Sequence, residues 1–183
     1  MANTASNVSA GKPAIGGAIY QAPTTATLPT DTTSTLTGFV GLGYISDSGL
    51  TNTNNFSGNT AVKAWGGDTV LSISGDKVDQ FKFTLIEVLN VDVLKTVFGA
   101  SNVTGDLSQG ITIKVNSQEL DENAYVIDMI MRDDTAKRVV IPRAKVITVG
   151  DVVYSDGEAV GYDVTIDCYP DSDGNTHYEY IKK

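Results

Sequence analysis

The residues with the clearest capacity for chemistry are one histidine, one cysteine and many carboxylates. His177 is the only histidine, so a Ser–His–Asp triad would have to use it, but the chain has no Gly-x-Ser-x-Gly elbow to present a serine. Residues 171–174, Asp-Ser-Asp-Gly, resemble the centre of a calcium loop. Their alignment puts Tyr169 and Tyr180 at the first and last loop positions, where calcium requires carboxylates. We therefore interpret 171–174 as a turn and His177 as a strand-edge residue.

The other candidate groups also have simpler structural explanations. Paired carboxylates such as those at 121–122 and 133–134 would suit the acid–base pair of a glycosidase, yet they lie in predicted turns where solvated charge is ordinary. Cys168 is the only cysteine, which excludes an internal disulfide and a cysteine-based zinc cluster. We expect no catalytic residue, no bound metal and no cofactor.

Length, charge and hydropathy describe a single domain that does not bind nucleic acid in the ordinary way. The 183 residues suit one domain with flexible additions, and the net charge of −9 comes from 22 acidic and 13 basic residues. Binding to nucleic acid needs clustered Lys and Arg that displace counterions from phosphates. The N-terminus lacks the features of a signal peptide, and no stretch approaches the ~18 continuous apolar residues of a membrane span. We expect a protein that stays in the cytoplasm of the cell that makes it.

Residues 1–35 are rich in Ala, Thr, Gly and Pro and are predicted to form an extended N-terminal arm. Pro13, Pro23 and Pro29 exclude a helix through this stretch. Such an arm is either a disordered leader or a segment that becomes ordered on a neighbouring subunit. Its apolar residues are the candidates for docking: Ile15, Ile19, Tyr20 and Leu28.

A short strand at 39–45 is followed by a polar stretch, 46–60, that is full of turn residues. Loops longer than about 12 residues in a compact domain are usually functional or disordered. We favour an interaction loop. Its candidate contact residues are Asp47, Leu50, Asn54 and Phe56.

The centre of the chain predicts a strand, a turn, a second strand and one helix. Residues 63–73 surround Trp65 and form the first strand, 74–77 form the turn, and 81–87 form the return strand. Asn90 can cap a helix over 90–98, and Gly99 suits the left-handed position that ends it.

The remainder alternates as strands do, with predicted strands at 111–115, 125–131, 138–141, 146–154, 160–169 and 177–182. Pro142 indicates an edge or a bulge. In the strand 160–169, the residues predicted to face the core are Tyr162, Val164, Ile166 and Cys168. Asp163 and Asp167 then lie on the opposite face.

This order of elements resembles the major tail protein, or tail tube protein, of long-tailed non-contractile phages that infect Gram-positive bacteria. The resemblance is densest in 62–99 and in the closing segment 174–183. It implies a mainly β fold: a β-sandwich or small barrel of two packed antiparallel sheets with one short flanking α-helix. It also implies a single β domain over 36–183 that follows the arm.

The resemblance implies a function in assembly and no enzyme activity. Tail tube proteins form stacked hexameric rings around a lumen through which double-stranded DNA passes during ejection, without specific binding. Asp163 and Asp167 would then line the lumen, where acidic groups repel phosphate; the alternative is ordinary solvent exposure. The loop at 46–60 and the N-terminal arm would contact neighbouring rings. The implied partners are a tape-measure protein, a tail terminator and baseplate or initiator proteins, with no membrane.

Two other classes of function remain open from the sequence. The first is a carbohydrate-binding or host-adhesion β-sandwich of a virion, in which Trp65 and the tyrosines form a stacking platform. The second is an acid hydrolase that uses two of the carboxylates. We rank the tail tube first, the adhesin second and the enzyme third.

Overall fold

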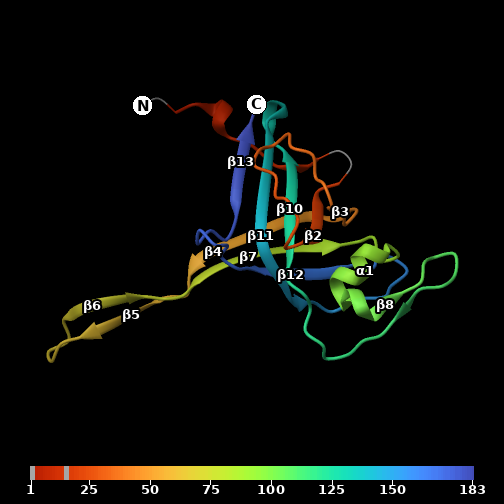
Figure 1. Cartoon of the computed structure of the whole chain (residues 1–183). Coiled ribbons are helices and arrows are strands. Elements are labelled where there is room, and N and C mark those ends of the chain that lie inside the picture. Colours follow the sequence, from red (N-terminus) through yellow and green to blue (C-terminus); the bar gives the residue numbers. More distant parts are fainter. Residues whose placement is uncertain (1–2, 15–16) are drawn as a thin grey trace.

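The structure, a computed structural model, describes residues 3–14 and 17–183 (Figure 1). Within these residues it is mainly β, with a single α-helix, α1 (Val91–Phe98), and three short 3-10 turns at Ala5–Asn7, Ala100–Asn102 and Arg132–Asp134. The strands are β1 (Lys12–Pro13), β2 (Ile19–Pro23), β3 (Val40–Gly41), β4 (Ile45–Phe56), β5 (Asn59–Lys63), β6 (Thr69–Ser74), β7 (Lys77–Leu85), β8 (Val103–Thr104), β9 (Thr112–Ile113), β10 (Asn123–Ile130), β11 (Ala136–Val149), β12 (Tyr162–Cys168) and β13 (Tyr178–Lys182).

One bent antiparallel sheet supplies both layers of the domain. Its order in the described residues is β3-β2-β10-β11-β12-β7-β4, with β1 also on β10 and β13 also on β11. The first half of β11 pairs with β10 and β13, whereas its second half, from Ala144, pairs with β12. Figure 1 shows β10, β11 and β13 running across β7 and β12. The predicted mainly β fold with one short helix is confirmed, and the two layers belong to one sheet that does not close into a barrel.

Pro142 marks the bend in β11. The register with β10 shifts there, because Ile141 lies opposite Tyr125 while Ala144 lies opposite Asn123. Proline has no N–H to donate to the ladder, so a bulge is one of the few strand positions it can occupy. The predicted bulge is confirmed. The core fills the space between the layers and includes Phe81, Phe83, Tyr125, Ile141 and Ile166.

The helix forms where its capping signals predict it. The Asn90 side chain accepts a hydrogen bond from the backbone N–H of Asp92, and Gly99 follows the last turn with a φ of 94°. Val93, Leu94 and Val97 are buried against the sheet. The Phe98 ring meets Tyr162 of β12 edge-on, with 5.5 Å between ring centroids.

The predicted loop at 46–60 is wrong, because this segment is strand β4 followed by the start of β5. Its threonines suit a strand and its asparagines do not, but β4 pairs with β7 from Leu50 opposite Phe83 to Phe56 opposite Lys77. Only Gly49, at the register shift between Ile45 and Leu50, needs a positive φ in this stretch of the strand.

The predicted hairpin across 74–77 is also wrong. β6 pairs with β5, and β7 pairs with β4, so residues 45–85 form one long hairpin whose turn lies at 64–68. The hairpin narrows at Gly58 and Gly75, where a Cβ on Gly75 would lie 2.0 Å from the Gly58 carbonyl oxygen. Position 75 therefore requires a glycine because the two strands approach closely there, and Gly75 does not mark a turn.

The predicted N-terminal arm, 1–35, is in part a component of the sheet. Residues 19–23 form β2, which pairs with β10 along its whole length, and Lys12 and Pro13 pair with the end of β10. Residues 24–39 run without regular structure over the sheet. Two strands are much shorter than predicted, since β3 covers only Val40–Gly41 and β9 covers only Thr112–Ile113. The strands predicted at 138–141 and 146–154 form one strand, β11, which ends at Val149.

Candidate functional site

The most distinctive feature of the structure is a projecting arm, which we define as residues 57–76 around β5 and β6. Figure 1 shows it extending away from the two layers. Every residue of β5 and β6 is exposed, so the arm contributes nothing to the core of its own subunit. Trp65 lies at the tip with its side chain fully exposed.

One face of the arm is apolar. The cross-strand pairs Val62–Leu71 and Thr60–Ile73 share this face, while Ala61–Ser72 and Asn59–Ser74 share the other. Val62, Leu71 and Ile73 are 41%, 55% and 52% exposed. An isolated two-stranded ribbon is at best marginally stable in water, so this face needs a surface to pack against. We call Val62, Leu71 and Ile73 the arm's apolar face.

A buried carboxylate fixes the root of the arm. Asp79 of β7 is buried and accepts hydrogen bonds from Asn52 Nδ2 of β4 (2.9 Å) and from the Thr176 hydroxyl. His177 Nδ1 lies 2.6 Å from Asp79 Oδ2, and its ring meets Phe81 edge-on. Burial by itself raises the pKa of Asp79, but the hydrogen bonds from Thr176, Asn52 and His177 outweigh it and hold the pKa below its ordinary value of 3.8. This cluster joins the arm's two root strands to the segment that leads into β13.

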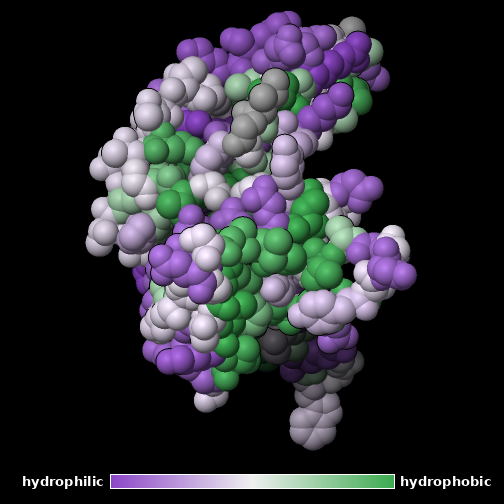
Figure 2. Space-filling view, turned by 90° about the vertical axis from the view of Figure 1, so that its right-hand side faces the viewer, coloured by the Kyte–Doolittle hydropathy of each residue, from purple (hydrophilic) through white to green (hydrophobic). Residues whose placement is uncertain are grey.

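A second exposed apolar surface lies on the side of the molecule that carries α1. Figure 1 places β8 next to α1, and Figure 2, which views the molecule from this side, shows hydrophobic surface gathered there. The exposed apolar side chains on the segments next to α1 are Leu89, Leu107, Ile113 and Val115. We call these four residues the α1-side face.

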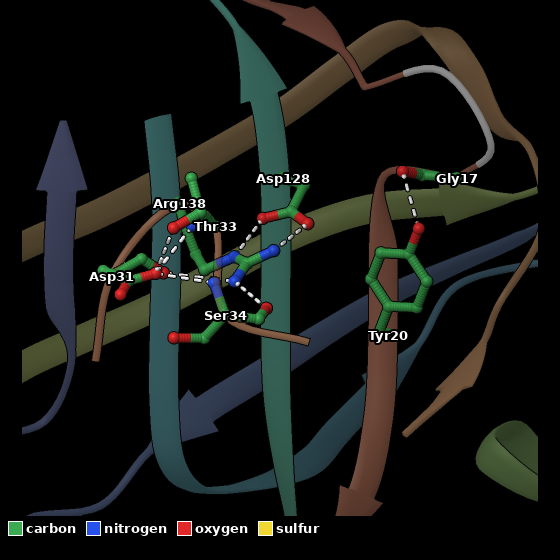
Figure 3. A network of polar contacts seen from close by, with 7 residues as sticks. All are labelled: Gly17, Tyr20, Asp31, Thr33, Ser34, Asp128 and Arg138. Atoms are coloured by element: carbon green, nitrogen blue, oxygen red, sulfur yellow. Dashed lines mark hydrogen bonds and ion pairs between the residues drawn. The ribbon is translucent and has the colours of Figure 1, made fainter. Parts of the chain in front are cut away.

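An ion pair under the segment 24–39 holds that segment on the sheet (Figure 3). Arg138 of β11, which is 6% exposed, donates from Nε (2.6 Å) and Nη2 (2.8 Å) to the two carboxylate oxygens of Asp128 on β10. Its Nη1 donates to the backbone carbonyls of Asp31 and Ser34. Hydrogen bonds from the backbone N–H of Thr33, and also from its side chain and from Ser34, lower the pKa of Asp31 to about 2. The network fixes the part of the predicted arm that follows β2.

The strand β12 alternates as predicted. Tyr162, Val164, Ile166 and Cys168 are buried, and the residues between them are half-buried. Asp163 and Asp167 are on the outward face, but neither is isolated. Asp163 Oδ2 lies 2.8 Å from Lys82 Nζ, and Asp167 Oδ1 accepts a hydrogen bond from Gln80 Nε2 at 3.1 Å. The face that carries the lumen candidates is therefore polar, with its acidic charge partly balanced by lysine.

The residues predicted for ring stacking lie along β4. Asp47 lies at the register shift, and Leu50 packs against the core, so Leu50 is not available for contact with another chain. Asn54 accepts a hydrogen bond from Lys77 Nζ. Phe56 is exposed at the root of the arm, with Lys77 Nζ 5.0 Å from its ring centroid.

The residues predicted for arm docking differ in how far the subunit itself buries them. Ile19 is fully buried in the subunit's own core, and Tyr20, half-buried beside it in β2, donates a hydrogen bond to the Gly17 carbonyl (Figure 3). Leu28 is half-buried in the segment held by Arg138. Ile15 lies outside the described residues. For Ile19 the docking prediction is wrong, because a strand of the same chain already covers its side chain.

Four strands of the large sheet, β1, β3, β4 and β13, pair with one strand only within residues 3–14 and 17–183, and β4 and β13 are the longest of them. β4 pairs only with β7, and β13 pairs only with β11, so the outer edge of each carries backbone donors and acceptors without strand partners. Such edges are ready to pair with another chain.

The groups suited to chemistry form no reactive centre in the part of the chain that is described. No cluster of three or more His, Cys, Asp and Glu side chains is arranged to hold a metal ion among these residues. Asp171 Oδ1 accepts backbone hydrogen bonds from Asp173 and Asn175, as expected for a turn. Burial raises the pKa of the Cys168 thiol far above its ordinary value. Across the described residues, α1 and the short helical turns fall well below the length and apolarity of a membrane-crossing helix.

Sequence reasoning missed the arm's apolar face. The alternation of Leu71 and Ile73 with Ser72 and Ser74 was a signal. Leu71 and Ile73 were assigned to a hairpin across 74–77, and Thr60 to the predicted loop, because pairing between β5 and β6 was not recognised. The two strands are joined by a short turn, so the signal was local and could have been found.

These surfaces define the class of the protein: a mainly β structural subunit with large faces and edges left for other chains. The family profile of the phage tail tube proteins matches residues 1–183, and the chain belongs to this family. No curated protein sequence matches it. Among solved structures, the chain is similar to the anti-feeding prophage cap, a tube-terminating cap solved by cryo-EM, with 10% sequence identity, 98% of each chain covered and a TM-score of 0.45. The predicted tail tube identity is confirmed, and the Gram-positive host stays a prediction.

Proposed function

We propose that this protein assembles into hexameric rings that stack to form the phage tail tube, through which double-stranded DNA passes during ejection. The observation that carries the proposal is the amphipathic arm on a chain of the tail tube family. An apolar face that its own subunit leaves exposed is stabilised only when another chain covers it. In this account the arm connects one ring to the next, and the segment 3–14 adds a further contact.

Within a ring, the unpaired edges of β4 and β13 support pairing between neighbouring subunits. Pairing satisfies the exposed backbone groups and removes an aggregation hazard. The outward polar face of β7 and β12 then becomes the candidate lumen wall, with Asp163 and Asp167 on it. A wall of this kind presents threonines, amides and balanced ion pairs, and lets DNA slide without sticking.

The family implies the remaining partners. They are a tape-measure protein inside the growing tube, a terminator at its end, and baseplate or initiator proteins at its start. The subunit would assemble in the host cytoplasm and act in the virion tail as a structural protein without enzyme activity.

Trp65 offers a direct test, because it is the only tryptophan and is fully exposed in the single subunit. We would record its emission and its quenching by acrylamide over a concentration series, with tail-tip complexes added as seeds, and measure sedimentation velocity on the same samples. We expect large particles whose Trp65 is shielded from acrylamide. Seeded samples that stay monomeric, with Trp65 fully quenched, would contradict the proposal.

The same residue favours one other function. A fully exposed tryptophan at the tip of a projecting hairpin suits stacking against a sugar ring, as in a host-adhesion module. Quenching or shielding of Trp65 by added cell-wall glycans, at a concentration where the protein is monomeric, would support the adhesin. No response to glycans, together with shielding on assembly, would exclude it.

A further inference from the structure

The outward face of β7 and β12 extends over the two strands beside them, β4 and the second half of β11. Two rows of side chains cross it: Lys145, Asp167, Gln80 and Thr53 form one row, and Thr148, Thr165, Lys82 and Thr51 form the next. Arg143 and Lys145 flank Ala144, which packs in the core, so both point outward. The face therefore carries three bases, Lys82, Arg143 and Lys145, among threonines and amides.

Each of these bases lies against a carboxylate. The pairs are Lys82 Nζ with Asp163 Oδ2 at 2.8 Å, Lys145 Nζ with Glu119 Oε2 at 2.7 Å, and Arg143 Nη2 with Glu122 Oε2 at 2.8 Å. Lysines without a carboxylate partner among the described residues occur elsewhere on the chain: Lys12, Lys63, Lys77, Lys114, Lys182 and Lys183. Complete pairing is therefore a property of this face and not of the whole surface of the subunit.

Two of the carboxylates come from outside the face. Glu119 and Glu122 belong to the segment between β9 and β10, and their side chains reach Lys145 and Arg143 of β11. The Glu119 side chain is 87% exposed, so it contributes little to packing. A hydrogen bond from Lys145, together with its charge, holds the pKa of Glu119 below its ordinary value, so the glutamate stays ionised beside the lysine. What this contact supplies is a negative charge next to Lys145.

The face is close to neutral as a result. Its three bases face four acids, Asp163, Asp167, Glu119 and Glu122, which leaves a net charge of −1, whereas the chain carries −9. Paired charges largely cancel beyond a Debye length, about 8 Å at physiological salt. A wall that repelled DNA would need a clear excess of acidic charge facing the phosphates. Most of the acidic excess of the subunit lies on other surfaces.

We propose that Asp163, Glu119 and Glu122 are positioning residues that neutralise the three bases of this face. DNA then fails to adhere because the cations are covered, and not because the anions repel phosphate. The inference rests on the proposed function, in which this face is the wall of the lumen. It names the residues that control contact between the wall and DNA.

Removal of one neutralising carboxylate would leave a cation free to bind phosphate. The Lys82 side chain is already 58% exposed, so Asp163→Asn frees its ammonium group without any movement of the strand. Each phosphate that binds a lysine releases counterions, and this gain repeats for every subunit that the DNA passes. A contact that is weak in one subunit therefore adds up along the tube.

Asp163→Asn and Asp167→Asn form a matched pair of variants. They remove the same charge from the same face of β12, but Asp163 pairs with Lys82, whereas Asp167 accepts a hydrogen bond from Gln80 Nε2. Neutralisation predicts an effect for Asp163→Asn alone, and repulsion of phosphate predicts the same effect for both. The double variant Asp163→Asn with Lys82→Gln removes the freed cation as well.

Seeded tubes of each variant would be mixed with a short labelled DNA duplex and sedimented at several salt concentrations. We expect wild-type and Asp167→Asn tubes to leave the duplex in the supernatant. Asp163→Asn tubes should retain severalfold more duplex, less so as the salt concentration rises, and Lys82→Gln should abolish this retention. Equal retention by Asp163→Asn and Asp167→Asn tubes, or none by Asp163→Asn tubes, would overturn the inference and leave the proposed function standing.

The free subunit provides a second readout that needs no tubes. Acetylation of Lys82 by an amine reagent, followed by mass spectrometry, should be faster in Asp163→Asn, where no carboxylate covers the ammonium group, and unchanged in Asp167→Asn. Equal rates in the wild-type protein and both variants would overturn the inference. Wild-type protein that stays monomeric with seeds would instead overturn the proposed function, and the acetylation rates would still decide whether Asp163 covers Lys82.

Discussion

Removing the arm's apolar face should weaken assembly without weakening the subunit. We would replace Val62, Leu71 and Ile73 together with threonine, which removes much of the apolar area but keeps a good strand former. Because all three side chains are exposed in the subunit, at 41%, 55% and 52%, the substitution removes nothing from its core. The stability of the folded monomer should stay within about 0.5 kcal/mol, the usual range for exposed positions.

The expected cost in assembly follows from the exposed fractions. Full burial of an aliphatic side chain of this size contributes about 1.5–3 kcal/mol, and burial of the exposed half therefore contributes about 1 kcal/mol for each residue. Three residues give about 3 kcal/mol per copy, which raises the concentration needed for assembly about 100-fold at 1.4 kcal/mol per factor of ten.

The assay is a concentration series by sedimentation velocity, with thermal unfolding as the check on the monomer. The matched control is the double substitution Ala61→Thr and Ser72→Thr on the opposite face of the same ribbon. We expect the control to assemble like the wild-type protein. Assembly of the triple variant at the wild-type concentration would refute the reasoning, because it would mean that no other chain covers the arm's apolar face.

Three further predictions concern the subunit itself. Asp79→Asn should destabilise it by about 2–3 kcal/mol, because the buried carboxylate accepts three hydrogen bonds. Since the pKa of Asp79 in the folded protein lies below 3.8, this loss should be constant above about pH 5 and shrink as the pH falls through that pKa. Urea unfolding at several pH values would show this dependence, and a loss of stability that grows toward acid would contradict it. Arg138→Met should lower the free energy of unfolding by about 3–5 kcal/mol and speed amide hydrogen exchange at 31–34, and the second substitution Asp128→Leu should restore much of the stability. Unchanged hydrogen exchange in Arg138→Met would contradict the role of Arg138 in holding the segment 24–39 on the sheet. Cys168 should resist a thiol reagent in the folded protein and react once urea unfolds it, and fast reaction of the native protein would contradict its burial.

The parts of the fold that were predicted correctly depend on short-range signals. The helix is specified by Asn90, by an apolar stripe and by Gly99, all within one segment. The alternation in β12 lies within seven residues, so its two faces could be assigned without knowing its neighbours. The bulge at Pro142 follows from the chemistry of proline alone.

The parts that were predicted wrongly depend on pairing between distant segments. Residues 51–55 of β4 are all Thr or Asn, and only their pairing with β7, across the whole arm, makes them a strand. Gly75 was interpreted as a turn residue, but its role is the close approach to Gly58, which lies 17 positions earlier in the numbering. Ile19 was assigned to a free arm because its partner strand, β10, lies more than a hundred residues further along the chain.

The candidate site was predicted only in outline for the same reason. Asp163 and Asp167 were placed on the correct face, yet their partners Lys82 and Gln80 come from β7 and could not be found from β12 alone. Residues 63–73 were predicted to be a strand that pairs with 81–87, and the arm's apolar face emerges only when β5 and β6 are paired.

Electron microscopy of the assembled protein tests the central claim most directly. The purified chain would be seeded with tail-tip complexes, or raised in concentration, and imaged to a resolution that places the strands. The account predicts hollow tubes of uniform width, built from stacked six-fold rings, with the arm of each subunit packed against a subunit of the next ring and Asp163 and Asp167 facing the lumen. Solid filaments, or rings whose arms extend into solvent, would contradict it.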